Sequence, residues 1–77
     1  MKTAFIRLST IQDVRNFVEI VNATEIDIDL SSGRYVVDAK SIMGIFSLDL
    51  LNPIKLTAHC DNCKELFDKL KPFIVEE

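Results

Sequence analysis

The stretch AKSIMGIFSL at residues 39–48 places Ser41 where a short helix is expected to begin. Serine is a favoured N-cap residue, because its hydroxyl accepts a hydrogen bond from a free backbone N–H group. The following side chains are more apolar than a helix of about two turns can bury. Ile45 and Leu48 are expected to face a sheet. The other large apolar side chains are expected to lie largely outside: Ile42, Met43 and Phe46.

Length and composition bound the class of protein. The chain has 77 residues, which suits one small core, so we expect a single domain over residues 1–77. Its net charge of −3 argues against direct binding to nucleic acid. No apolar stretch approaches the roughly 20 residues of a membrane-spanning helix. Because Arg7 comes too early for a signal peptide, we expect a cytoplasmic protein without a membrane partner.

The first half of the chain reads as a strand, a helix and a hairpin. Apolar residues alternate from Ala4 to Leu8, and Ser9 with Gln12 forms a capping-box pattern that predicts a helix start. The apolar face of that helix is Val14, Phe17, Val18 and Val21. Residues 25–30 and 34–39 alternate as two strands around a turn at 31–33. Their predicted inward residues are Ile26, Ile28, Leu30, Tyr35, Val37 and Ala39.

The second half adds a strand and a helix after the break at Asn52-Pro53. The strand has Ile54, Leu56, Ala58 and Cys60 inward. The last helix is expected to start near Asp61 or Asn62, with Glu65 placed for a capping box. Its apolar face is Cys63, Leu66, Phe67, Leu70 and Phe73. The order βαββαβα predicts an α+β fold of two layers, with helices on one face of an antiparallel sheet.

Three segments of this chain resemble the HPr proteins, the phosphocarriers of the bacterial sugar phosphotransferase system. They are Phe17-Val18, the hairpin that ends at Ser41, and residues 42–48, which look like the form of low-GC Gram-positive bacteria. The resemblance runs from about Val14 to Phe73. It implies an open-faced β-sandwich with four antiparallel strands and three helices on one face.

The chain departs from that family at the active site. HPr proteins carry a Gly-Leu-His-x-Arg-Pro-Ala loop, whose histidine takes phosphate from phosphorylated enzyme I and passes it to sugar-specific transporter components. Counting back from Phe17 without gaps puts Thr10 at the histidine position and Gln12 at the arginine, unless the loop is deleted. Either way, an imidazole nucleophile and a guanidinium group are missing. We expect no histidine phosphorelay, no enzymatic activity and no cofactor.

The resemblance implies a regulatory role for Ser41. In HPr proteins the matching serine is phosphorylated by HPr serine kinase, and positions matching Ile42, Met43 and Phe46 dock partners. Lys40 is then expected as a counter-charge for the phosphate. The catabolite-repression HPr of bacilli, which lacks the histidine and binds the catabolite control repressor, is similar in logic. We expect a regulatory phosphoprotein of carbon catabolite repression. The simpler alternative is an unmodified binding module with a capping serine.

Two other candidate sites remain open. His59 is expected on the outer sheet face with Lys55, opposite Asp27 and Asp29, as a structural pair or a relocated phosphoryl site. The Cys60-Asp61-Asn62-Cys63 segment is read as two small core residues. Its alternatives are a thiol–disulfide protein that uses Cys60 and Cys63, or zinc with His59. A structural disulfide is not expected in a reducing cytoplasm, and no metal site is predicted.

Overall fold

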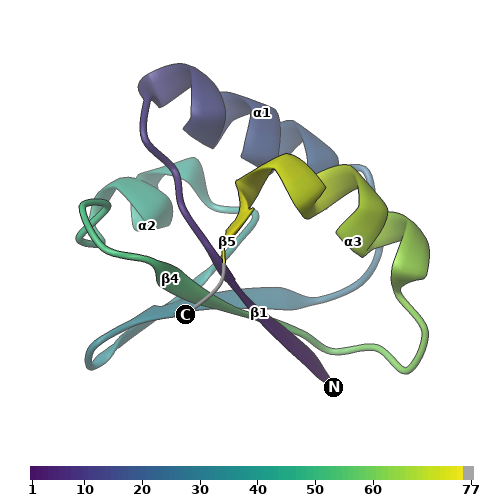
Figure 1. Cartoon of the computed structure of the whole chain (residues 1–77). Helices are drawn as coiled ribbons and strands as arrows, with labels where there is room; N and C mark the ends of the chain where they lie inside the picture. The colour runs from purple at the N-terminus through teal and green to yellow at the C-terminus, as the bar shows by residue number, and fades with distance from the viewer. Residues whose placement is uncertain (76–77) are drawn as a thin grey trace.

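The computed structural model describes residues 1–75, which form a sheet with helices packed above it (Figure 1). The elements follow the predicted order, with two short elements added at the end. In chain order they are β1 (Lys2–Ile6), α1 (Ile11–Asn22), β2 (Ile28–Ser32), β3 (Tyr35–Asp38), α2 (Ile42–Phe46), β4 (Ile54–Ala58), α3 (Lys64–Leu70), the 3-10 turn η1 (Lys71–Phe73) and β5 (Ile74–Val75).

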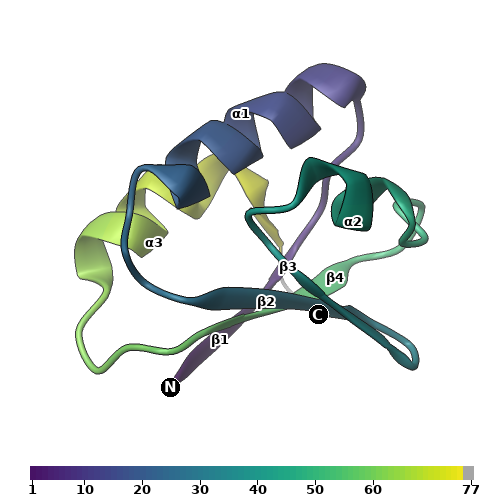
Figure 2. The same ribbon diagram turned by 180° about the vertical axis from the view of Figure 1, so that it is seen from behind.

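One antiparallel sheet contains all the described strands, in the order β3-β2-β4-β1-β5. The three α-helices lie on one face of this sheet, with α1 between α2 and α3 (Figures 1 and 2). The predicted α+β architecture is therefore confirmed. The sheet has five strands rather than four, because β5 pairs with β1 through Phe5 and Ile6. A strand of two residues is too short to show alternation in a sequence.

Strand β4 is the centre of the sheet. Its inward side chains Ile54, Leu56 and Ala58 are fully buried beneath the helices. Leu56 pairs with Ala4 of β1 on one side and with Leu30 of β2 on the other. This cross-strand row places apolar side chains of three strands on the covered face.

The helix layer supplies the other half of the core. Val14, Phe17 and Val21 of α1 are fully buried, as their spacing predicts, and Val18 is half-buried. The ring of Phe17 meets that of Phe73 edge to face, with centroids 6.0 Å apart and planes at 86°. This pair ties α1 to the segment that leads into β5.

The β2–β3 hairpin is displaced from the predicted position. The strand expected over 25–30 begins at Ile28 and continues through Ser32, so the turn is centred on Gly33. Gly33 has φ of +60°, a left-handed conformation that favours glycine. Tyr35 pairs with Ser32 near the hairpin tip, which extends past the helix layer (Figure 1). Tyr35 shares the inward face of β3 with Val37, but its side chain is 71% exposed, so the expected burial was wrong.

Helix α1 begins one residue later than its capping-box pattern suggested. Thr10, rather than Ser9, is the N-cap, and its Oγ1 accepts a hydrogen bond of 3.0 Å from the Asp13 N–H. The Asp13 carboxylate in turn accepts a 3.0 Å bond from the Ser9 N–H. The partner three residues after the cap is thus Asp13, and Gln12 points its amide to Asn16 instead.

Helix α3 also begins later than expected, at Lys64. The flanking residue is Cys63, which makes no side-chain capping bond. The expected capping box between Asn62 and Glu65 was therefore wrong. Asn62 Oδ1 accepts only a long bond of 3.5 Å from the Lys64 N–H.

The central position of β4 predicts a large difference between two leucines. Leu56→Ala should lower the free energy of unfolding by about 2–5 kcal/mol, because it leaves a cavity in the middle of the core. Leu51→Ala removes the same atoms from a side chain that is 86% exposed and should change stability by less than about 0.5 kcal/mol. Urea unfolding of both variants measures this, and equal effects would contradict the packing described.

Candidate functional site: the helix cap at Ser41 and the surface beside it

Ser41 links the end of β3 to α2. Its backbone is extended, with φ of −99° and ψ of 106°, and its Oγ accepts a hydrogen bond of 3.2 Å from the Gly44 N–H. The Ser41 N–H donates to the Asp38 carbonyl at 3.0 Å, which fixes the turn between strand and helix. The side chain remains exposed. The structure thus confirms Ser41 as a helix cap whose hydroxyl is accessible.

Gly44 sets how closely α2 approaches the sheet. A Cβ atom at this position would lie 3.3 Å from Cβ of Val37 in β3 and 3.4 Å from Oγ of Ser41. The distance to Val37 is tighter than ordinary van der Waals contact, and the distance to Ser41 is at its lower edge. A glycine therefore allows the helix to pack against β3 while its N–H group reaches the capping hydroxyl.

The apolar side chains of α2 and of Leu48, just after it, divide between core and solvent largely as predicted. Ile45 is fully buried and Leu48 is 6% exposed, whereas Met43 is 77% and Phe46 is 42% exposed. Ile42 was expected outside, but it is half-buried and packs against the core. The exposed apolar surface of α2 therefore rests mainly on Met43 and Phe46.

Lys40 connects the start of α2 to the end of α1. Its Nζ donates a 2.9 Å hydrogen bond to the Thr24 carbonyl, and its own carbonyl accepts a 3.4 Å bond from the Asn22 amide. The ammonium group is therefore already held at Thr24, sixteen residues away in the chain. Sequence spacing carried no signal for this contact.

The first turn of α1 lies at the same end of the molecule as α2 (Figures 1 and 2). It contains the two positions at which the HPr-type active site would be expected, Thr10 and Gln12. The Thr10 hydroxyl is occupied as the cap of α1, and the Gln12 amide donates to Asn16 at 2.9 Å. Ile11 in this turn is 64% exposed. Sequence reasoning missed Ile11, whose only signal is an apolar residue ahead of the predicted core face.

His59 lies just beyond β4, where its Nε2 is 2.8 Å from Oδ2 of Asp29. Its N–H donates to the Asp27 carbonyl at 2.9 Å. The predicted pairing is confirmed for His59, whereas Lys55 lies opposite Ser31 rather than an aspartate. Both partners of the pair are 42% exposed, so the interaction contributes little to stability.

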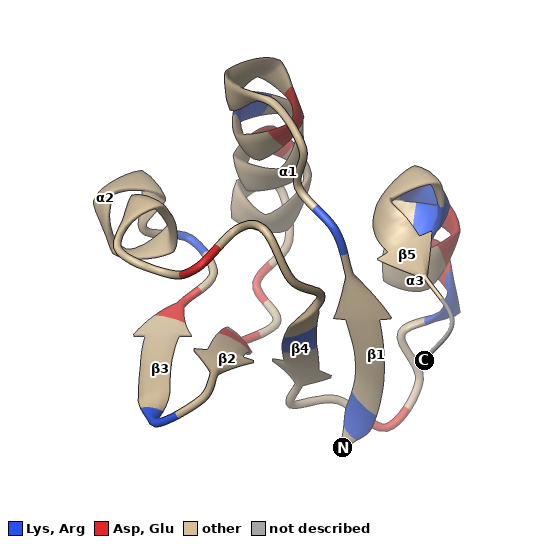
Figure 3. Cartoon of the chain, turned by 60° about the vertical axis from the view of Figure 1, so that its left-hand side comes forward, with Lys and Arg blue, Asp and Glu red and all other residues tan. Residues whose placement is uncertain are grey.

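The surroundings of His59 are acidic. Asp29 is directly opposite Asp38 in the β2–β3 register, and these two line a shallow pocket with Asp27 and His59. Acidic positions at the neighbouring ends of β2 and β3 are visible in Figure 3. Like charges in facing positions destabilise a strand pair, and the His59 ring gives one of these carboxylates, Asp29, a close partner.

Cys60 and Cys63 form a disulfide bond. The expectation of two unpaired core thiols was therefore wrong, and so was the expectation that no disulfide would form. Cys60 lies past the end of β4 and is half-buried, while Cys63 is 5% exposed and packs with the core. The spacing brings two sulfurs together because the chain reverses between strand and helix at this point.

Among residues 1–75, no group of three or more His, Cys, Asp and Glu side chains could hold a metal ion. None of the described helices is long and apolar enough to cross a membrane.

Comparison with solved structures gives several strong matches. HPr-C-His from Thermoanaerobacter tengcongensis is 29% identical, with a TM-score of 0.79 over 94% of this chain and 89% of that one. The phosphocarrier protein HPr from Bacillus anthracis is 26% identical, with a TM-score of 0.71 over 96% and 94%. The histidine-containing phosphocarrier protein of Mycoplasma shares the fold at 14% identity, with a TM-score of 0.69 over 92% and 86%. No protein-family model and no curated protein sequence matches the chain.

The capping geometry predicts how stability responds to substitution of Ser41. Ser41→Ala should lower the free energy of unfolding by about 1 kcal/mol, because the Gly44 N–H loses its acceptor. Ser41→Asp keeps an acceptor at the cap and should stay close to the parent. Urea unfolding measures both variants. An equal loss for alanine and aspartate would contradict the capping role.

Proposed function

The chain has the fold of the HPr phosphocarrier proteins, which are not enzymes, and from this we propose that it is an HPr-like regulatory protein controlled by phosphorylation of Ser41. The proposed protein works without the phosphotransfer histidine of the HPr proteins. The observation that carries the proposal is an exposed hydroxyl at the cap of α2, with the exposed side chains of Met43 and Phe46 in the helix that follows.

Neither of the two candidate phosphoryl acceptors, His59 and Thr10, is suited to phosphotransfer. The chain has a single histidine, His59, which is bonded to Asp29 and shares its pocket with two more carboxylates, Asp27 and Asp38. These negative charges oppose the approach of a phosphoryl donor. Thr10 offers only a hydroxyl, a weak nucleophile, and this hydroxyl already caps the helix. A phosphorelay through this chain has no suitable nucleophile.

The surface at α2 supports regulation through Ser41. A helix cap alone requires only one acceptor, which Asp or Asn would supply as well. It does not account for Met43 and Phe46, which are exposed beside the cap although large apolar side chains are costly in water. A phosphate on Ser41 would add nearly two negative charges at the edge of this apolar surface. Modification would then change both the charge and the cap geometry of the docking surface.

Lys40 can serve as the counter-charge only after a local rearrangement. Its ammonium group is bonded to the Thr24 carbonyl, so pairing with a phosphate on Ser41 requires that bond to be exchanged. A charge-assisted bond to phosphate is stronger than one to a neutral carbonyl. We therefore include Lys40 in the proposed switch, together with Ile42, Met43 and Phe46.

We propose HPr serine kinase and a regulatory protein of the catabolite control repressor type as partners, acting in the cytoplasm in carbon catabolite repression. Gln12 stands where HPr proteins have an arginine, and Phe46 and Asp49 stand where methionine and glycine are common. The Asp49 carboxylate is bonded to the Leu51 N–H and the Asn52 amide, so its charge is held within the loop. These substitutions favour a partner surface different from that of an ordinary HPr.

The proposal predicts one phosphate per chain after incubation with HPr serine kinase and ATP. Intact-mass spectrometry should detect it on the parent and on Ser47→Ala, and should detect none on Ser41→Ala. Because loss of the cap costs only about 1 kcal/mol, Ser41→Ala stays folded and its result is interpretable. A parent that takes up no phosphate would overturn the switch and leave an unmodified HPr-like binding module.

The exposed apolar surface can be tested in the same reaction. Met43→Ala should slow phosphorylation, because Met43 lies two residues from the modified hydroxyl and is 77% exposed. Val36→Ala is the matched control, since Val36 is an exposed apolar residue of β3, next to the inward Val37 and on the opposite face of the strand. Equal rates for the parent and both variants would exclude Met43 from kinase docking.

The missing nucleophile gives a second biochemical prediction. Phosphoenolpyruvate and enzyme I should leave the chain without phosphate, under conditions in which an authentic HPr is fully phosphorylated. His59→Ala serves as the control for a relocated site. Acid-labile phosphate on the parent that disappears in His59→Ala would contradict the proposal and assign phosphotransfer to His59.

A further inference from the structure

The Cys60–Cys63 pair has a chemistry that the proposed regulatory function does not use. We propose that it is a thiol–disulfide exchange site, which reacts at Cys60 with dithiols and with low-molecular-weight disulfides. The oxidised state is the one that the structure contains. The folded protein then cycles between this disulfide and a dithiol.

The position of the disulfide argues against a role as a structural staple. The two cysteines are three residues apart, and closing so short a loop removes little entropy from the unfolded chain. Backbone bonds already hold both ends of the loop. The Cys60 N–H donates to the Ala58 carbonyl at 3.0 Å, and the Cys63 carbonyl accepts from the Phe67 N–H at 3.0 Å. Each end of the loop is therefore anchored to its own element by a backbone bond, Cys60 to the end of β4 and Cys63 to α3.

The two sulfurs differ in their surroundings. Cys60 packs against the core but is only half-buried, and the two residues that follow it, Asp61 and Asn62, are exposed. Cys63 is 5% exposed and packs in the core beside Leu66. Since thiol reactivity requires access to the sulfur, an incoming thiolate reaches Cys60 first, and Cys63 is the leaving group.

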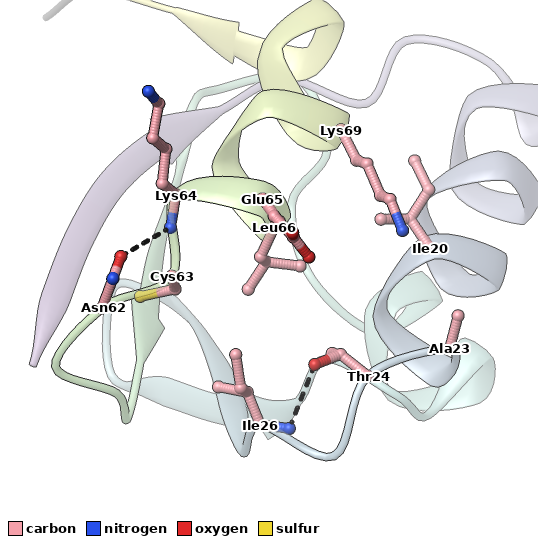
Figure 4. Close-up of a pocket in the computed structure, with 10 residues that line it drawn as sticks. All are labelled: Ile20, Ala23, Thr24, Ile26, Asn62, Cys63, Lys64, Glu65, Leu66 and Lys69. Atoms are coloured by element: carbon pink, nitrogen blue, oxygen red, sulfur yellow. Dashed lines mark hydrogen bonds between the residues drawn. The ribbon is translucent and has the colours of Figure 1, made fainter.

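A cleft lies on the other side of Cys63. It has a volume of about 480 Å³ between the end of α1 and the start of α3, and Figure 4 shows Cys63 on its wall. Ile20 and Leu66 give it apolar surface, and Lys64 and Lys69 line it as well. The cleft provides room for the Cys63 side chain to turn away after the bond breaks.

The reaction balances as a two-electron exchange. A thiolate of the dithiol attacks Sγ of Cys60, a new sulfur–sulfur bond forms, and the Cys60–Cys63 bond breaks with its electron pair on Cys63, which takes a proton from water. The second thiol of the reagent then gives up its proton. The resulting thiolate attacks the reagent's first sulfur, which is bonded to Cys60 in the mixed disulfide. This step releases Cys60 as a thiolate, which is protonated, and leaves the reagent as a cyclic disulfide. The protein gains two electrons and two protons, and the dithiol loses them.

The test is a titration of the folded full-length chain with dithiothreitol, followed by alkylation and intact-mass spectrometry. We expect full reduction without denaturant, recovery of the disulfide with oxidised glutathione, and the same behaviour in Ser41→Ala. The last result separates this site from the proposed switch, because it stands whether or not Ser41 is phosphorylated. A disulfide that resists dithiothreitol until the protein is unfolded would identify a structural bond and overturn the proposal. A reduced chain that oxidised glutathione does not close would overturn it too.

The order of attack is tested with single variants. In Cys63→Ser, the remaining Cys60 should form a mixed disulfide with oxidised glutathione at least about tenfold faster than Cys63 does in Cys60→Ser. Circular dichroism of both variants checks that they are folded. Equal rates in two folded variants would overturn the assignment of Cys60 as the attacked sulfur.

Discussion

The register of β4 is the constraint on which the rest of the structure depends. Its inward side chains meet Ala4 on one side and Leu30 on the other, beneath the helices. Because side chains alternate along a strand, a slip of one residue would turn this apolar row to solvent. The same register carries His59 to Asp29 on the outer face. It also determines where the chain leaves the sheet, and so where Cys60 meets Cys63.

Much of the fold followed from local patterns, because burial enforces them. The face of α1 and the alternation of β4 are periodic over several residues, and both are confirmed. Predictions failed at boundaries, where several residues of similar chemistry compete. Ser9 and Thr10 can both cap a helix, and only Thr10 has Asp13 three residues later as its bonded partner. Tyr35 has the right alternation, but it lies where no helix covers the sheet.

The same distinction holds at the candidate site: features set by neighbours in the sequence could be predicted, and features set by distant contacts could not. The Ser41 cap and the exposure of Met43 were readable from sequence, since both depend on neighbours within one helix. The bond from Lys40 to Thr24 was not readable, because it depends on how α1 ends relative to β3. The sequence showed the spacing of Cys60 and Cys63 but did not establish a bond between them. Its formation required the turn between β4 and α3, which the sequence suggested but placed too early.

Thr24 has a consequence that reaches across the molecule. Its carbonyl holds the ammonium group of Lys40, and the same residue lines the cleft that contains Cys63. One residue therefore touches both the segment that precedes α2 and the cavity beside α3. If release of Lys40 alters the free energy of filling that cavity, then filling the cavity must alter the release of Lys40 by the same amount, because linkage between two sites is reciprocal. Thr24, just past the end of α1, is the residue through which any such linkage between the two flanks of the helix layer would pass.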